Sequence, residues 1–87
     1  MSKKDYENTR RYFGNLMYTH RREKKNISMD TLANATNLDV NNLSRIERGE
    51  QMPESTTIAK IIEALDIDPI EFHKNFCEQI KIDELKK

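Results

Sequence analysis

The sequence predicts an all-α protein with five helices in a single domain. Two glycines and two prolines in 87 residues leave few helix breakers, while the abundant Lys, Glu and Leu favour helices. Apolar residues recur at spacings of three and four, and a chain this short has room for one domain. We expect residues 1–12 to be an N-terminal extension that forms part of the first helix. Residues 13–80 are the expected domain, and residues 81–87 are a C-terminal tail.

The first helix is expected from Asp5 to about Lys24, after frayed residues 1–4. Its apolar positions follow the i, i+3, i+4, i+7 pattern and so share one face: Phe13, Leu16, Met17 and His20. Gly14 lies within this helix and costs about 1 kcal/mol relative to alanine.

Two short helices joined by a tight turn are expected at about residues 29–48. Ser28 and Asp39 each precede one of them and are side chains of the type that caps a helix N-terminus. Asn37 lies in the turn and tolerates positive φ better than other non-glycine residues. Gly49 ends the second helix because glycine adopts left-handed backbone readily. Such a short connection turns the second helix steeply away from the first, as in a helix-turn-helix.

Caps and apolar spacing also predict the last two helices. Ser55 is expected to cap the fourth helix, whose buried side is Ile58, Ile61, Ile62 and Leu65. Asp68 begins the fifth helix as an acidic cap, with Pro69 at the first helical position and Glu71 three residues after the cap.

The fifth helix carries two apolar stripes, one of Ile70, His73 and Cys77 and the other of Phe72, Phe76 and Ile80. One stripe is enough to close the core of a domain this small. We therefore assign the surplus stripe, Phe72, Phe76 and Ile80, to the interface of a homodimer. A single wide buried face is the alternative.

Charge is distributed unevenly although the formal net charge is zero. Residues 1–25 hold eight Lys and Arg against three acids, a balance of +5, and residues 26–87 hold seven against twelve, a balance of −5. Local positive charge of this kind contacts phosphate, although a solvated helix face would look the same. No apolar run is long enough for a transmembrane helix or signal peptide. The single cysteine, Cys77, fits a reducing cytoplasm.

The stretch Ile27–Gly49 resembles the helix-turn-helix of the phage-repressor (Cro-type) family of bacterial DNA-binding regulators. The matching residues are Leu32-Ala33, Asn37-Leu38, Leu43-Ser44 and Ile46-Glu47-Arg48-Gly49, followed by Pro53 and Ser55 at the family's spacing. The resemblance covers roughly Phe13–Phe76. It implies a five-helix, lambda-repressor-like DNA-binding domain with its helix-turn-helix at about 29–48.

The second helix of such a motif lies in the major groove, where its outward side chains meet the bases. Geometry and resemblance both place the base contacts on Val40, Asn41 and Arg45. Asn41 can bond adenine, Arg45 can bond guanine bidentately, and Val40 can pack on a thymine methyl group. Contacts to the DNA backbone are expected from Asn42, Ser44, Arg48, Lys24 and Lys25. The alternative is an ordinary solvent-exposed polar face.

The family also carries an arginine in its first helix that pairs with the glutamate at the position of Glu47. This implies a structural ion pair rather than a DNA contact for Glu47. Arg21 and Arg22 both lie near the arginine's position, and the link from it to Ser28 is one residue longer than usual. We expect Arg21 to be the partner.

Two residues depart from the family pattern where it grips the DNA backbone. Met29 stands in place of a glutamine that braces a phosphate, and its thioether cannot donate a hydrogen bond. Asp39 replaces the usual Ser or Thr cap and would repel a phosphate. Lys24 and Lys25 are therefore expected to supply side-chain charge.

The expected function is sequence-specific transcription regulation by a cytoplasmic homodimer that binds double-stranded DNA. Its size is similar to that of the small controller proteins of restriction–modification systems, with small phage or plasmid repressors as further candidates. The extension before Phe13 is either an arm that touches DNA or extra helix, and we expect extra helix. No cofactor, metal, membrane or small-molecule ligand is expected.

Two other functions compete with this one. An enzyme is disfavoured because His20, His73 and Cys77 all fall on apolar stripes, His73 and Cys77 are too few ligands for zinc, and no glycine-rich phosphate loop is present. The second is a repressor-like fold that serves as a protein-interaction, anti-regulator module without specific DNA binding. Neutral net charge, Met29 and Asp39 favour that alternative.

Overall fold

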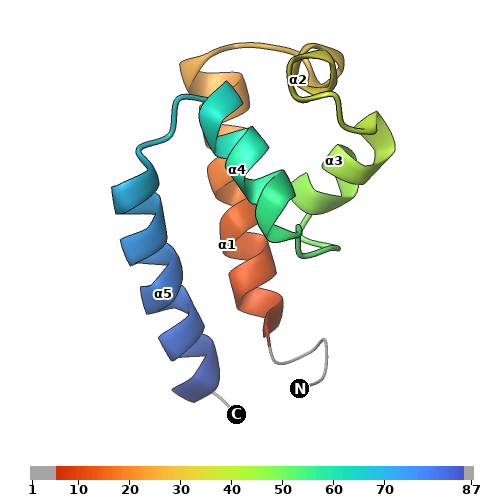
Figure 1. The fold of residues 1–87 in the computed structure, drawn as a ribbon. Coiled ribbons are helices and arrows are strands. Elements are labelled where there is room, and N and C mark those ends of the chain that lie inside the picture. The colour runs from red at the N-terminus through yellow and green to blue at the C-terminus, as the bar shows by residue number, and fades with distance from the viewer. Residues whose placement is uncertain (1–5, 86–87) are drawn as a thin grey trace.

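A computed structural model describes residues 6–85 and confirms the all-α architecture (Figure 1). The elements, in order, are α1 (Glu7–Tyr18), the π-helical turn η2 (Thr19–Lys24), α2 (Met29–Thr36), α3 (Val40–Glu47), α4 (Ser55–Ala64) and α5 (Pro69–Leu85). The expectations for residues 1–4, for a start at Asp5 and for residues 86 and 87 lie outside the described residues. Within the described part, no helix is long and apolar enough to cross a membrane.

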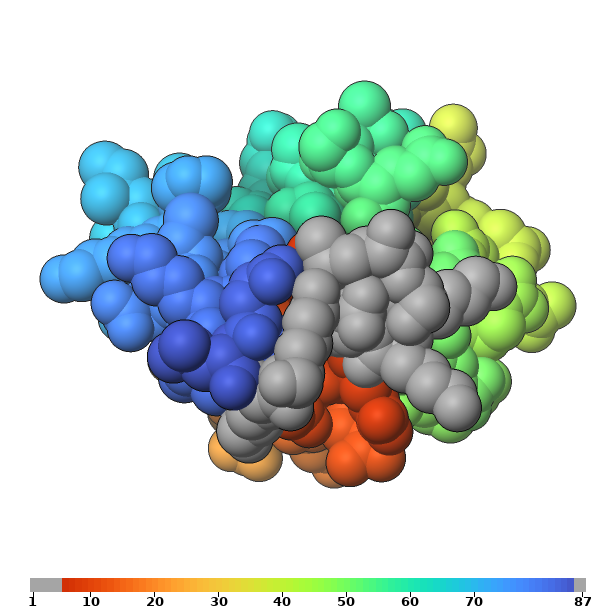
Figure 2. Space-filling model, turned by 90° about the horizontal axis from the view of Figure 1, so that it is seen from below, coloured from red at the N-terminus to blue at the C-terminus, as the bar shows by residue number. Residues whose placement is uncertain are grey.

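The helix α1 lies between α3 on one side and α5 on the other, and it contacts both (Figure 1). Seen from below, the blue surface of α5 and the yellow-green surface of α3 lie on opposite sides (Figure 2). One end of the helix-turn-helix is thus held by α1, and α5 covers the other side of α1.

The local signals at the turns are those that the sequence predicted. Ser28 Oγ accepts a hydrogen bond from the Thr31 N–H at 3.0 Å, and Asp39 Oδ2 accepts one from the Asn42 N–H at 3.0 Å. Asn37 has φ 57°. Each of these side chains or backbone conformations ends or begins a helix without help from distant residues.

The caps of the last two helices are confirmed in one case and wrong in the other. Asp68 Oδ1 accepts a hydrogen bond from the Ile70 N–H at 3.0 Å, as a capping side chain should. Ser55 is instead the first residue of α4, and Glu54 occupies the cap position without a side-chain hydrogen bond. The preference of serine for caps predicted the right boundary to within one residue.

Within residues 6–85, nine buried apolar residues form the core: Phe13, Met17, Leu32, Leu43, Ile46, Ile61, Leu65, Ile67 and Phe72. Phe72 is 7% exposed and meets Phe13 edge to face, with ring centroids 5.6 Å apart. The assignment of Phe72 to a dimer interface is therefore wrong, because its ring closes the core of its own protomer. Phe76 stacks on Phe72 at 5.3 Å and is half-buried, as is Ile80. The stripe that faces solvent is the other one, where Ile70 is 81% exposed.

The C-terminal end of α5 is part of the fold. Residues 81–85 are helical, so the tail expected from residue 81 is corrected for these residues. Asp83 is buried and accepts hydrogen bonds from the Thr9 hydroxyl and, at 2.7 Å, from the Thr9 N–H. Asp83 Oδ1 has no hydrogen-bond partner among the described residues. This contact ties the end of α5 to the first turns of α1.

Gly14 allows α1 and α3 to approach each other closely. A Cβ atom built there would lie 2.4 Å from the backbone oxygen of Glu47 and 2.9 Å from that of Ile46. Any larger side chain would push the two helices apart. The glycine that weakens α1 as an isolated helix is what lets the end of α3 rest on it.

Candidate nucleic-acid interface

The second helix of the predicted motif, α3, has one buried and one open side. Leu43 and Ile46 are 0% and 1% exposed and fix the helix against the core. On the open side, Asn41, Arg45 and Arg48 are exposed, and Val40, Asn42 and Ser44 are half-buried. The structure therefore brings six of the predicted DNA contacts onto one helix face.

The C-terminal end of α3 is held to the protein by a buried ion pair. Arg21 Nε and Nη2 donate to the two carboxylate oxygens of Glu47 at 2.8 and 2.7 Å, and Arg21 Nη1 donates to the Ile27 carbonyl at 2.8 Å. The two charged side chains are 9% and 12% exposed. The hydrogen bonds to Glu47 raise the pKa of Arg21 above its usual value. Glu47 therefore faces the protein and not an approaching ligand.

The π-helical turn η2 positions this arginine. Its backbone bonds span five residues, as from the Lys25 N–H to the His20 carbonyl at 3.0 Å, so it contains one more residue than an α-turn. This extra residue accounts for the long link between Arg21 and Ser28. The exposed Arg22 lies beside Arg21 in the sequence but outside the pair.

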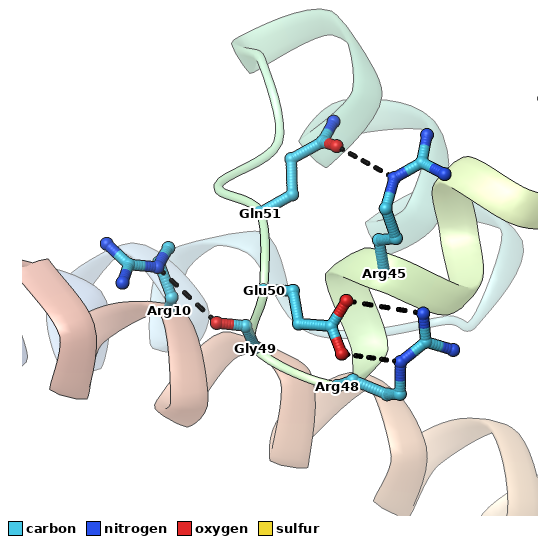
Figure 3. A network of polar contacts seen from close by, with 6 residues as sticks. All are labelled: Arg10, Arg45, Arg48, Gly49, Glu50 and Gln51. Carbon is cyan, nitrogen blue, oxygen red and sulfur yellow. Dashed lines mark hydrogen bonds and ion pairs between the residues drawn. The ribbon is translucent and has the colours of Figure 1, made fainter.

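The same end of α3 carries a second, exposed ion pair (Figure 3). Arg48 Nε and Nη2 donate to the carboxylate oxygens of Glu50 at 2.8 and 3.3 Å, and the side chains are 56% and 54% exposed. The hydrogen bond from Arg48 lowers the pKa of Glu50 and raises that of Arg48. A phosphate approaching Arg48 must therefore compete with a carboxylate already in place.

The loop after α3 joins this face in ways that sequence analysis missed. Gln51 contacts side chains of α3, and Arg10 Nε donates to the Gly49 carbonyl at 3.4 Å (Figure 3). Gly49 has φ 76° and lies against the backbone of α1 at Arg11. No spacing rule connects residues 39 positions apart, so only the charge balance of residues 1–25 hinted that arginines of α1 lie here.

Lys24 and Lys25 lie near the connection between α4 and α5. Lys25 Nζ forms an ion pair with Asp66 Oδ2 at 2.6 Å, in the connection between α4 and α5. Lys24 lines a small cavity together with Asp68 and Glu71, also at that connection. Both lysines thus lie near acidic side chains at this connection, and their contact with the DNA backbone stays a prediction.

Two of the remaining candidate groups, His73 and Cys77, lie on α5. Among the described residues, no three His, Cys, Asp or Glu side chains are placed to hold a metal ion. His73 Nε2 and Cys77 Sγ lie 3.6 Å apart on the open face of α5. An open groove of about 760 Å³ lies between α4 and α5, with Ile58, Ile62 and Phe72 in its lining.

Comparison with known proteins agrees with this geometry. Residues 20–72, more than half of the chain, match a family model described as helix-turn-helix. The comparison with curated proteins and the comparison with solved structures found no match. The matched span begins inside η2 and includes α2, α3 and α4, the elements that hold and present the polar helix face. The chain belongs to the Cro/C1-type helix-turn-helix family, a family of DNA-binding regulators.

Proposed function

We propose that this protein is a transcription regulator that binds DNA sequence-specifically as a homodimer, through α3 in the major groove of a two-fold symmetric operator. The carrying observation is the two-sided character of α3. Leu43 and Ile46 anchor it in the core while Asn41 and Arg45 are exposed on its other side. A helix that is rigid on one side and polar on the other can be inserted into a groove without rearrangement.

Base recognition is assigned to the first two turns of α3. Asn41 presents an amide that matches the adenine edge, and Arg45 presents a guanidinium that matches the guanine edge. Val40 is half-buried and keeps some apolar surface that could pack on a thymine methyl group. Each good bidentate contact contributes about 1–3 kcal/mol of discrimination against the wrong base.

Phosphate contacts are assigned to Asn42, Ser44 and Arg48, with helix N-termini as additional donors. Asp39 already accepts a hydrogen bond from the Asn42 N–H, which leaves part of its charge compensated by the helix it caps. Met29 begins α2 and contributes no side-chain donor. Arg10, beside Gly49, brings further positive charge to the same side of the molecule.

Dimerisation is assigned to the side of α5 that carries Phe76 and Ile80. Both residues are half-buried, so each keeps apolar surface for a second copy. The neighbouring groove between α4 and α5 adds Ile58 and Ile62 to that surface. A dimer with two-fold symmetry would place its two α3 helices about 34–36 Å apart, one turn of DNA.

Selection from random duplex DNA at near-physiological salt, followed by sequencing, tests this function. A two-fold symmetric motif with fixed spacing is expected. Arg45→Ala should weaken binding to the selected site by about 1–3 kcal/mol and relax one base position. The matched control is Lys81→Ala, which removes the same charge from exposed surface on α5. Absence of any enriched motif would contradict specific binding and favour a protein-interaction role.

The dimer is tested by sedimentation of the wild type and of Ile80→Asp. A charged group at a closed apolar interface is costly, so the variant should sediment as a monomer with an unchanged circular dichroism spectrum. Phe76→Asp is the second variant, although it also removes a ring stacked on the core residue Phe72. An intact dimer in Ile80→Asp would exclude this side of α5 from the interface.

A further inference from the structure

Gln51 contacts two side chains of the recognition helix at once, although it lies in the loop after it. Its Nε2 atom donates to Asn42 Oδ1 at 2.6 Å, and its Oε1 atom accepts from Arg45 Nε at 3.3 Å (Figure 3 shows the second bond). Gln51 is half-buried, whereas Arg45 is exposed. The two ends of one amide thus connect a predicted phosphate contact with a predicted base contact.

The chemistry of the three groups fixes the direction of both bonds. A guanidinium has donors and no acceptor, so the oxygen of Gln51 must face Arg45. Its NH₂ group must then face Asn42, and Asn42 must turn its own oxygen toward it. This leaves the Asn42 NH₂ group as a free donor, which is the polarity that a phosphate needs. It also occupies Arg45 Nε and leaves the two terminal nitrogens of Arg45 for a base.

The loop holds Gln51 in this place through its backbone. The Glu50 N–H donates to the Arg45 carbonyl at 3.0 Å, and the Gly49 N–H donates to the Ile46 carbonyl at 3.0 Å. Pro53, two residues beyond Gln51, is buried. The loop is therefore bonded to the end of α3 on one side of Gln51 and leads to a buried proline on the other. These bonds fix the backbone from which the Gln51 side chain extends toward α3.

We propose that Gln51 is a positioning residue for sequence recognition: it orients Arg45 toward its base and Asn42 toward a phosphate before DNA binds. The inference rests on the proposed DNA-binding function and adds to it a residue outside the recognition helix. A long exposed arginine must give up rotamer freedom to bond a base. An arginine already held at Nε gives up less of that freedom, so its contact discriminates better between bases.

The test measures a ratio of dissociation constants and not affinity alone. The first duplex is the selected wild-type site, and the second has the base pair assigned to Arg45 replaced. Gln51→Ala is expected to reduce the ratio between the two by about two- to tenfold, the equivalent of one side chain left to be ordered on binding. In an Arg45→Ala background, Gln51→Ala should leave the ratio unchanged, because the residue acts through Arg45.

Gln51→Glu separates positioning from general effects on binding. Its carboxylate still accepts from Arg45 but cannot donate to Asn42, and its charge opposes phosphate. We expect weaker binding to both duplexes with the wild-type ratio retained. Gln79→Ala is the matched control, a half-buried glutamine on α5, and should change neither quantity.

Each result decides between clear outcomes. A wild-type ratio in Gln51→Ala overturns the inference while leaving the proposed function intact, whether or not affinity for both duplexes falls together. A wild-type protein that selects no motif overturns the proposed function and this inference with it. Loss of the ratio in Gln51→Ala and its recovery in Gln51→Glu would establish the positioning role.

Discussion

Glu47 and Arg48 are adjacent in the sequence at the end of α3, and each forms an ion pair with two hydrogen bonds, but one pair is buried and the other is exposed. Glu47 meets Arg21 with both side chains almost fully buried, whereas Arg48 meets Glu50 with more than half of each side chain exposed. The first pair joins elements 26 positions apart, and the second joins residues two positions apart. The buried pair therefore stabilises the fold, whereas each member of the exposed pair can exchange its partner for another charged group.

Burial is what separates the two roles. Removing one partner of a buried pair leaves the other charge without water or a counter-ion, which costs several kcal/mol. An exposed pair gains little over the hydration of its separate charges and weakens with salt. Loss of the buried pair should therefore lower the free energy of unfolding, whereas loss of the exposed pair should mainly change DNA binding.

The largest effect is expected for the buried pair. Arg21→Ala leaves the Glu47 carboxylate buried without its partner and also removes the donor to the Ile27 carbonyl. The free energy of unfolding should fall by about 3–5 kcal/mol, measured by urea denaturation. Arg22→Ala is the matched control because Arg22 is exposed. Equal urea midpoints for the two variants would show that the buried pair stabilises the fold no more than an exposed arginine does.

A smaller effect is expected at Gly14, where α1 meets the backbone of Glu47. In Gly14→Ala, the new methyl group would lie 2.4 Å from the Glu47 carbonyl oxygen. Overpacking of this kind costs about 1–3 kcal/mol, against about 1 kcal/mol gained in helix propensity. Thermal unfolding should show net destabilisation, whereas Asn15→Ala at the exposed neighbouring position should not. A more stable Gly14→Ala would mean that the two helices separate easily.

The exposed pair should affect binding and leave folding nearly unchanged. Arg48→Ala is expected to retain the wild-type urea midpoint. If Arg48 neutralises a phosphate, the slope of log K against log salt should become shallower by about 0.9, measured by fluorescence anisotropy with the selected duplex. An unchanged slope would show that Glu50 keeps Arg48 away from the phosphate in the complex.

The smallest effect concerns the protonation of Glu50. Its hydrogen bond with Arg48 holds the pKa of the Glu50 carboxyl below the ordinary 4.5. A carboxyl whose pKa is lower in the folded state stabilises the fold above pH 4.5, and this contribution is lost as the pH falls through the lower value. Carbon-13 NMR titration should give a Glu50 pKa that returns toward 4.5 in Arg48→Ala. A Glu50 pKa that is the same in both proteins would mean that the pair does not persist in solution.

The features that sequence analysis predicted are those decided by a few neighbouring residues. Ser28, Asp39 and Asp68 cap helices through hydrogen bonds to N–H groups two or three positions away. Asn37 and Gly49 adopt positive φ because the chain turns at those points. The family resemblance added Arg21 and Glu47 as partners, which spacing alone could not provide.

The features that it missed or placed wrongly depend on where distant helices meet. Phe72 and Ile70 lie on different stripes of α5, and only contact with α1 decides which stripe is buried. Lys25 forms an ion pair with Asp66, 41 positions later, which no pattern in the sequence indicated. Asp83, an acid near the end of a helix, gave no signal that it would be buried against Thr9.

The π-helical turn η2 also introduces an angular offset into the continuous helical stretch that α1 and η2 form together. One extra residue in a turn rotates everything before it by about 100° relative to everything after it. The faces of α1 and the segment that presents Arg21 to Glu47 are thus offset in angle within one continuous helical stretch. An alignment that treats residues 7–24 as one uninterrupted α-helix would therefore misplace every residue before Thr19 by one position.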